Sequence, residues 1–264
     1  MKKVLSILTV LVMLFSLTAC GKNNVNSSKL DNRELRTISY EGKTVDEKVK
    51  SVLSQLSLEQ KVCQMLQGAV YHMNVNEMEE NCYGSVLSNL NNPTDATGWK
   101  NVITSFQESA LLSDAKIPFL YGNDAVHGHN TVTNTTIFPH NIGIGAANDP
   151  ELTYKMGAAV AEEMKLSGVL WNFAPCVAQA EDPRWGRTYE SYSTDIDIIT
   201  SLSVQFAKGQ LDHGIMPCAK HFIGDGNVKM GTGEPGEKGR IIDRGDAELT
   251  DAEIEELLKP YKAL

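Results

Sequence analysis

Five residues that lie far apart in the sequence carry side chains suited to binding a hydroxyl-rich molecule. The carboxylate of Asp124 accepts hydrogen bonds, whereas Arg187 and Lys220 donate them. His221 can do either, and Glu190 follows Arg187 closely enough to orient its guanidinium group. Sugar hydroxyls both donate and accept hydrogen bonds, so these residue types favour a sugar-binding site.

Each of these residues also has an ordinary structural explanation. Asp124 could cap a turn, and His221 could be a hydrogen-bonded core residue. Arg187 could form an ion pair with Glu190 or Asp182. A shared site is favoured by their placement, because they stand at or after the ends of segments predicted to be buried strands.

The stretch "AEDPRWGRTYES", residues 180–191, holds the densest mixture of charges. We expect Arg187 to reach a hydroxyl and Trp185 to supply an apolar face nearby. Glu181 and Asp182 are expected to hold the turn rather than to act as catalytic carboxylates.

The elements that must position these residues alternate along the chain. Apolar runs predict strands, and apolar residues at helical spacing predict helices. The expected strands span residues 84–90, 117–124, 169–175 and 215–222. The expected helices span 44–66 (two helices, the second capped by Ser57), 98–115, 149–168 and 195–214, and a last helix begins at Thr250.

Repeated strand–helix alternation indicates parallel strands joined by helical crossovers. Both an open doubly wound sheet and a (β/α)8 barrel fit that pattern. A barrel gathers the carboxyl ends of several strands around one mouth, whereas an open sheet concentrates its ligand at one switch point. Because three separate strands end in polar residues, the predicted fold class is α/β, an incomplete (β/α)8 TIM-like barrel.

Composition narrows the classes of partner. The 264 residues carry 24 Lys and Arg against 33 Asp and Glu, a formal net charge of −9, and 42% of them are hydrophobic. This acidic balance argues against a nucleic acid partner, because phosphate binding needs a basic surface. The sequence is typical of a globular protein large enough for one substantial core.

The first residues are expected to be a targeting segment rather than part of the fold. Lys2 and Lys3 precede an apolar run from Val4 to Leu17, which is too short for a membrane span. The following "LTAC" resembles the lipobox of bacterial lipoproteins, although an ordinary cleaved signal is the alternative. We therefore expect a signal peptide over 1–19 and lipid on Cys20, the only membrane attachment predicted.

The resulting domain organisation has a flexible polar tether over 20–43 and a barrel domain over 44–264. The protein is then expected to be an exported lipoprotein of the cell envelope. The cysteines beyond Cys20 form no C-x-x-C pair, so we expect small buried hydrophobes rather than ligands or disulfides.

No cofactor or metal is expected. The pair His127 and His129 lacks a third nearby ligand, so two hydrogen-bonding histidines are favoured over a metal site. The glycine-rich stretches from Gly143 and Gly231 lack the residues that a dinucleotide site or a P-loop needs.

Four stretches, "YGNDAVHGHN", "NFAPCVAQAEDPRWGRTYESYSTD", "AKHFIGDG" and "DRGDAEL", closely resemble the N-terminal domain of family 3 glycoside hydrolases of the β-glucosidase type. The resemblance implies a (β/α)8-like barrel and exo-acting, retaining cleavage of β-linked glucosides or related sugars, without metal or cofactor. By position, the residues that match those holding the terminal sugar in subsite −1 are Asp124, Arg187, Lys220 and His221. Supporting roles are expected for Glu190, which matches a residue that steadies the arginine, and for Trp185 and His129.

The resemblance also limits what this chain is expected to do. The β-N-acetylglucosaminidase branch has a catalytic histidine where this chain has Asp225, so that branch is disfavoured. The family's nucleophile lies in an "SDW"-like segment, which is expected beyond Leu264, as are the acid/base, the rest of the barrel and a second domain. We therefore expect the chain to carry the residues that bind an oligosaccharide or β-glucoside substrate but to be inactive alone. We also expect it to be unstable, because an open partial barrel leaves strand edges and apolar surface uncovered.

Two other functions stay open at this point. A sugar-binding lipoprotein would keep the hydroxyl-binding residues and need no nucleophile. A purely structural scaffold would give no sugar protection in thermal melts. The sequence does not separate glucose from xylose specificity.

Overall fold

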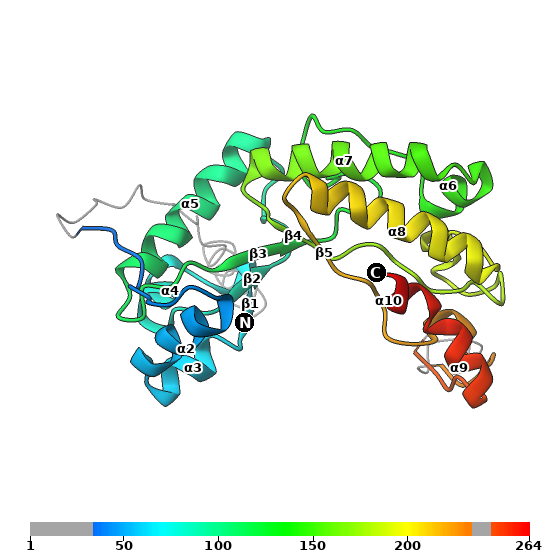
Figure 1. Ribbon diagram of the computed structural model, residues 1–264. Helices are drawn as coiled ribbons and strands as arrows, with labels where there is room; N and C mark the ends of the chain where they lie inside the picture. The colour runs from blue at the N-terminus through cyan, green and yellow to red at the C-terminus, as the bar shows by residue number, and fades with distance from the viewer. Residues whose placement is uncertain (1–33, 234–243) are drawn as a thin grey trace, which may run out of the picture. The chain divides into compact units, whose positions relative to one another are not determined.

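The computed structural model describes residues 34–233 and 244–264, and these residues build one α/β unit. Its sheet has five parallel strands in the order β1-β2-β3-β4-β5 (Figure 1). Their bounds are β1 Gln67–Ala69, β2 Ser85–Leu87, β3 Leu120–Asn123, β4 Trp171–Asn172 and β5 Met216–Pro217. The strand order never reverses, so this part of the chain has no topological switch point. That order confirms the predicted incomplete barrel over the open doubly wound sheet.

Helices connect the consecutive strands. Before β1 come α2 Val45–Gln55 and α3 Leu58–Cys63, and the crossovers contain α4 Val75–Asn81, α5 Ala96–Leu112, α6 Asn141–Ala147, α7 Pro150–Ser167 and α8 Ile196–Asp212. After β5 come α9 Asp251–Leu257 and α10 Lys259–Ala263. The described residues also form three single turns of 3-10 helix: η1 Val70–His72, η2 Thr188–Glu190 and η3 Asp225–Asn227.

Local capping explains where several helices begin and end. The Asp149 side chain accepts a hydrogen bond from the Leu152 backbone, Pro150 occupies the first turn, and Gly168 ends α7 with a positive φ of 86°. The two predicted capping boxes form, with Ser57 at the start of α3 and Thr250 at the start of α9.

The core lies where α5, α7 and α8 pack together beside the sheet (Figure 1). Apolar side chains fill it, among them Trp99, Phe106, Val160, Met164, Ile199, Leu202 and Phe206. Helices α7 and α8 approach closely through two glycines, since a Cβ on Gly157 would lie 2.3 Å from the Phe206 carbonyl oxygen. One on Gly209 would lie 2.3 Å from that of Tyr154.

The first strand was not predicted. β1 is only three residues long, Gln67–Ala69, and contains a glycine, so it has neither an apolar run nor alternation. Its pairing with β2 in parallel register, Gly68 opposite Val86, makes it a strand.

The domain begins earlier than the sequence indicates. The Ile38 backbone N–H donates to the Lys116 carbonyl, and the Ile38 side chain packs against the core. The expected signal peptide over 1–19, the expected lipid site Cys20 and most of the expected tether lie outside the described residues. Within the ranges that the structure describes, no helix has both the length and the apolar character to cross a membrane.

Candidate functional site

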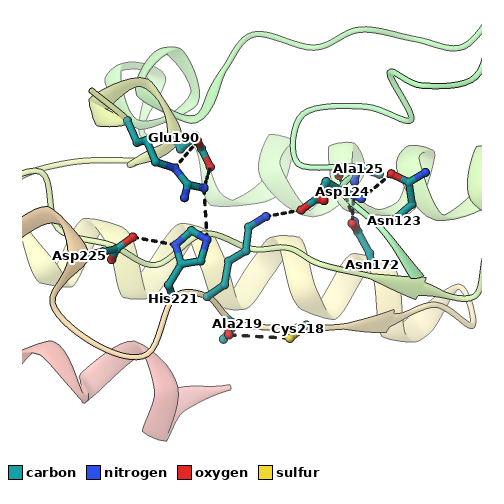
Figure 2. Close-up of polar contacts among 11 residues, drawn as sticks. Asn123, Asp124, Ala125, Asn172, Glu190, Cys218, Ala219, His221 and Asp225 are labelled. Carbon is teal, nitrogen blue, oxygen red and sulfur yellow. Dashed lines mark hydrogen bonds and ion pairs between the residues drawn. The ribbon is translucent and has the colours of Figure 1, made fainter. Parts of the chain in front are cut away.

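Four of the predicted sugar-binding residues meet beyond the carboxyl ends of β3, β4 and β5 (Figure 2). Asp124 directly follows β3, and Lys220 and His221 follow β5. Arg187 comes from the long connection after β4, at the start of η2. Parallel strands thus bring residues from three different crossovers to one edge of the sheet.

The first contact at this edge is an ion pair between Lys220 and Asp124. The Lys220 Nζ donates to the Asp124 Oδ1 at 2.5 Å. The lysine side chain is largely buried at 13% exposure, while that of the aspartate is open at 60%. Backbone hydrogen bonds from Lys220 N to Pro175 O and from Val177 N to Lys220 O extend the β4–β5 pairing and hold the lysine.

Asp124 is held by asparagines that the sequence analysis did not single out. Asn123 Oδ1 accepts from the Asp124 backbone N–H at 2.6 Å. Asn172 of β4 is fully buried and fixes Ala125, the residue after Asp124. Its Oδ1 accepts from Ala125 N and its Nδ2 donates to Ala125 O (Figure 2). An asparagine inside the apolar run "VLWNFAP" was the available signal.

Arg187 and Glu190 form the second pair. Arg187 Nε and Nη2 donate to the two carboxylate oxygens of Glu190, each at 2.7 Å. Burial raises the pKa of Glu190, but the hydrogen bonds and charge of Arg187 outweigh it and hold that pKa below its ordinary value. The Glu190 backbone is fixed by Asn141 of α6, whose Nδ2 donates to its carbonyl at 2.7 Å.

His221 connects Arg187 to a further carboxylate. Its Nε2 lies 3.2 Å from Arg187 Nη2, and its Nδ1 lies 2.7 Å from Asp225 Oδ2 (Figure 2). The imidazole is about a third exposed, so it lies at the surface of the site rather than in the core. A chain of contacts therefore runs from Asp225 through His221 and Arg187 to Glu190.

The two predicted supporting aromatics point elsewhere. Trp185 is 2% exposed and packs with Cys176, Ala178 and Ala180. Its ring therefore offers no face to a sugar and instead packs inside the connection that carries Arg187. His129 is fully buried, its Nε2 pairs with the Ser167 hydroxyl at 2.8 Å, and burial lowers its pKa to about 4. Both side chains are buried and do not face the candidate site.

The other residues of interest have structural contacts. Asp182 binds the Arg184 side chain, which holds the pKa of that carboxyl at about 2, and Glu181 accepts from Asn227. His127 stacks on His140 at a ring distance of 3.8 Å and contacts the Phe138 carbonyl. Among the described residues, no group of three histidine, cysteine or acidic side chains is placed to bind a metal.

The arrangement suits a neutral polyhydroxy ligand. Asp124 offers an open acceptor, and Lys220 and Arg187 offer charged donors that are already fixed in place. Hydrogen bonds to charged groups are about twice as strong as neutral ones, so such a site can compete with water for hydroxyls. The opposite charges nearly balance, which does not favour a strongly charged ligand.

Comparison with known proteins gives the family of this chain. Residues 57–264 match the family model described as "Glycosyl hydrolase family 3 N terminal domain". The chain is 27% identical over 182 residues to a lysosomal beta glucosidase of Dictyostelium discoideum, covering 61% of this chain and 22% of that protein. It is 26% identical over 240 residues to a beta-xylosidase of Formosa agariphila, covering 86% and 27%.

A solved structure shows the same arrangement of elements. The exo-1,3/1,4-beta-glucanase of a Pseudoalteromonas species superposes with a TM-score of 0.74 at 32% identity, over 81% of this chain and 28% of that one. The chain thus spans about a quarter of the length of these relatives. The family match over most of the chain places this protein in glycosyl hydrolase family 3, as part of the family's N-terminal domain.

Proposed function

We propose that this chain is the sugar-holding part of an exo-acting, retaining β-glycosidase that removes terminal β-linked glucose or a related sugar. The observation that carries the proposal is the convergence of Asp124, Lys220, Arg187 and His221 beyond three strand ends. The names of the relatives, a beta glucosidase and a beta-xylosidase, support the same reaction class and leave the sugar open.

The terminal sugar would lie against these four side chains. Asp124 would accept hydrogen bonds from two neighbouring hydroxyls, while Lys220 and Arg187 would donate to the oxygens beside them. Because each donor is paired before the sugar arrives, little side-chain freedom is lost on binding.

Three described carboxylates lie at the site, those of Asp124, Glu190 and Asp225, and none of them suits the chemical step. Retaining hydrolysis uses two carboxyl groups about 5–5.5 Å apart, one as nucleophile and one as acid/base. Glu190 is bound at both oxygens by Arg187 and its pKa is lowered, so it is a poor proton donor. Asp124 is paired with Lys220. Asp225 accepts from His221 Nδ1 through one oxygen, and its other oxygen is buried. We therefore assign the nucleophile and the acid/base to other parts of the parent enzyme, and expect the 264-residue chain to be inactive.

The test combines an activity assay with sugar binding. The purified chain should not hydrolyse 4-nitrophenyl β-D-glucoside or β-D-xyloside, but glucose or xylose should raise its thermal midpoint. Asp124→Ala should abolish that shift, whereas Asp114→Ala, at an exposed position outside the site, should keep it. Turnover that survives purification and disappears in Asp124→Ala would contradict the assignment of an inactive chain.

A sugar-binding lipoprotein without hydrolytic activity is the second candidate. It is favoured by one observation. Among the described residues of the site, Asp124 is paired with Lys220, Glu190 with Arg187 and Asp225 with His221, which leaves no free nucleophile there. The coding sequence after Leu264 separates the two functions. An "SDW"-type aspartate followed by a second α/β domain supports the hydrolase, and a stop codon supports the binding protein.

We also propose export and lipid attachment at Cys20. The support is the charged start, the short apolar run and the cysteine that follows small residues. In a bacterial host, the chain should incorporate radiolabelled palmitate and sediment with membranes. Cys20→Ser should abolish both, whereas Cys63→Ser should abolish neither; an unlabelled wild-type chain in the soluble fraction would contradict the anchor.

A further inference from the structure

The imidazole of His221 is held between a cation and a carboxylate. On one side, Arg187 Nη2 lies 3.2 Å from His221 Nε2. On the other, Asp225 Oδ2 lies 2.7 Å from His221 Nδ1 (Figure 2). Lys220, which precedes this histidine, donates to Asp124 and not to His221 or Asp225. The two ring nitrogens of His221 therefore have opposite kinds of partner.

These partners determine which ring nitrogen carries the hydrogen. A guanidinium group only donates hydrogen bonds, so His221 Nε2 must present its lone pair to Arg187. In a neutral imidazole the hydrogen then resides on Nδ1, which donates it to the Asp225 carboxylate. The reverse tautomer would point an N–H of His221 at an N–H of Arg187.

We propose that Asp225 is a positioning residue that fixes the Nδ1–H tautomer of His221, so that the lone pair of His221 Nε2 accepts from Arg187 and helps to hold its guanidinium group at the sugar pocket. The part that concerns sugar rests on the proposed function. Glu190 and His221 then both accept from Arg187, so the guanidinium group is held from two sides. A sugar hydroxyl that accepts from Arg187 would meet a donor whose direction is fixed before binding.

The fold holds Asp225 rigidly enough for this role. Asp225 is the first residue of η3, and Gly224, which precedes it, has a positive φ of 89°. The next residue, Gly226, lies so close to the preceding crossover that a Cβ would meet the Gln179 carbonyl oxygen at 1.8 Å and the Trp185 ring at 3.3 Å. Buried Trp185 therefore supports the turn that carries Asp225.

The backbone of His221 is held from another element. The hydroxyl of Tyr261 in α10 donates to the His221 carbonyl oxygen. The backbone and Nδ1 of the histidine are thus fixed by residues that follow it in the sequence. Among the described residues, the second oxygen of Asp225, Oδ1, is buried without a hydrogen-bond partner, so the contact with His221 is the one that this carboxylate makes.

The tautomer can be read directly by NMR. In the ¹⁵N-labelled chain, long-range ¹H–¹⁵N correlations distinguish protonated from unprotonated ring nitrogens, and His221→Gln identifies the His221 signals by their loss. We expect a protonated Nδ1 and an unprotonated Nε2 at pH 8. A protonated Nε2 in the wild-type chain would overturn the proposal without reference to any variant.

Variants test whether Asp225 is responsible. Asp225→Asn replaces the carboxylate with an amide that can also donate a hydrogen bond to His221 Nδ1. The Nε2–H tautomer of His221 should then become populated, which would be visible as averaged ¹⁵N shifts of the two ring nitrogens. Asp225→Glu, which keeps the carboxylate, should retain more of the wild-type signature. The matched control is Glu162→Gln, because Glu162 contacts His213 Nδ1 at 2.7 Å in the same way but away from the site. It should change the His213 signals and leave those of His221 alone.

Sugar binding supplies the functional readout. With glucose as the probe, Asp225→Asn should bind about fivefold more weakly than wild type, the loss expected for one hydrogen bond. An unchanged tautomer and affinity in a folded Asp225→Asn chain would refute the proposal. If wild type binds no glucose while His221 shows the expected tautomer, the proposed function fails and the positioning role of Asp225 stands.

Discussion

At the residue scale, the candidate site consists of pairs in which a carboxylate orients a neighbouring side chain. Arg187 is fixed by Glu190 at both of its carboxylate oxygens, and His221 is fixed by Asp225. Such pairing removes rotamer freedom before a ligand arrives. It also makes the shape of the site depend on the charge of the orienting carboxylates.

Glu190→Gln should destabilise the chain by about 2 kcal/mol at pH 7, because it breaks a half-buried charged pair. The pKa of Glu190 is lower in the folded chain than in the unfolded chain, where it is about 4.3. The ionised carboxylate therefore contributes its full stability above that unfolded pKa, and the contribution is lost as the pH falls through the folded pKa. Urea unfolding at pH 7, 5, 4 and 3 measures this.

The control for that experiment is Glu151→Gln. Glu151 pairs with Lys155 on the exposed face of α7, where its side chain is 80% exposed, so its loss should change stability by less than about 0.5 kcal/mol. A constant difference between wild type and Glu190→Gln across the pH range would contradict the assigned pairing.

His129 gives a second prediction at the residue scale, and it concerns a group that is positively charged when protonated. Burial lowers its folded pKa to about 4, while an unfolded histidine titrates near 6.5. Between these values the unfolded chain binds a proton that the folded chain does not. Stability should therefore decrease from about pH 6.5 towards pH 4, by up to about 3 kcal/mol from this residue.

The slope of stability against pH is the measurement, again by urea unfolding. His129→Gln should flatten that slope between pH 6.5 and 4, even though it also lowers stability at pH 7. His72→Gln, at an exposed position, should leave the slope unchanged. Equal slopes for wild type and His129→Gln would show that His129 is not kept neutral by the fold.

At the element scale, short irregular segments rather than helices and strands position the site. The 3-10 turn η2 carries Glu190, and η3 carries Asp225. Both depend on contacts with distant residues, Asn141 for η2 and the pair Gln179 and Trp185 for η3. The site therefore depends on close packing between crossovers.

Gly226→Ala tests that packing. The added methyl group would overlap the Gln179 carbonyl, so η3 must shift, at a cost of about 1–3 kcal/mol in unfolding free energy. Because Asp225 is the neighbouring residue, glucose binding should weaken as well. Chemical unfolding and a glucose titration measure the two effects.

Gly186→Ala is the matched control for Gly226→Ala. A Cβ at Gly186 would meet nothing within 4 Å, although this glycine lies in the same charged loop as Arg187. Its effect on stability should be below about 0.5 kcal/mol. Equal effects of the two substitutions would mean that the close approach of η3 is not structurally important.

At the scale of the whole molecule, the described unit leaves much apolar surface uncovered. Helix α2 has no buried residue, and Val49 on it is 49% exposed. Met65, just after α3, is 85% exposed, and the two residues line one groove with Leu53. Exposed apolar surface of this kind promotes association.

The chain should therefore bind the dye ANS and show a sedimentation coefficient that increases with concentration. The double substitution Val49→Lys and Met65→Lys should reduce both effects without lowering stability, because neither side chain is buried. Leu166→Lys, at a 66% exposed position on α7, should change neither. A wild-type chain that is monomeric at every concentration and binds no dye would contradict this.

Several features of the protein could be predicted from the sequence because they depend on neighbours in the chain. Capping residues such as Ser57, Asp149 and Thr250 mark helix ends through bonds spanning three or four positions. Polar residues at strand ends, Asp124 and Lys220 among them, indicated the edge where the site lies. The family follows from contiguous motifs for the same reason.

The tertiary structure alone decided which side chains face the site. Trp185 and His129 stand in sequence motifs expected to line a sugar pocket, yet both are buried. The direction of a side chain in an irregular loop depends on packing against residues far away in the sequence. The role of Asn172 and the strand β1 were likewise decided by long-range pairing. Residue types and local spacing thus determined the helices, most of the strands and the edge of the sheet where the candidate site lies. Long-range packing determined the strand order and which side chains lie at that site.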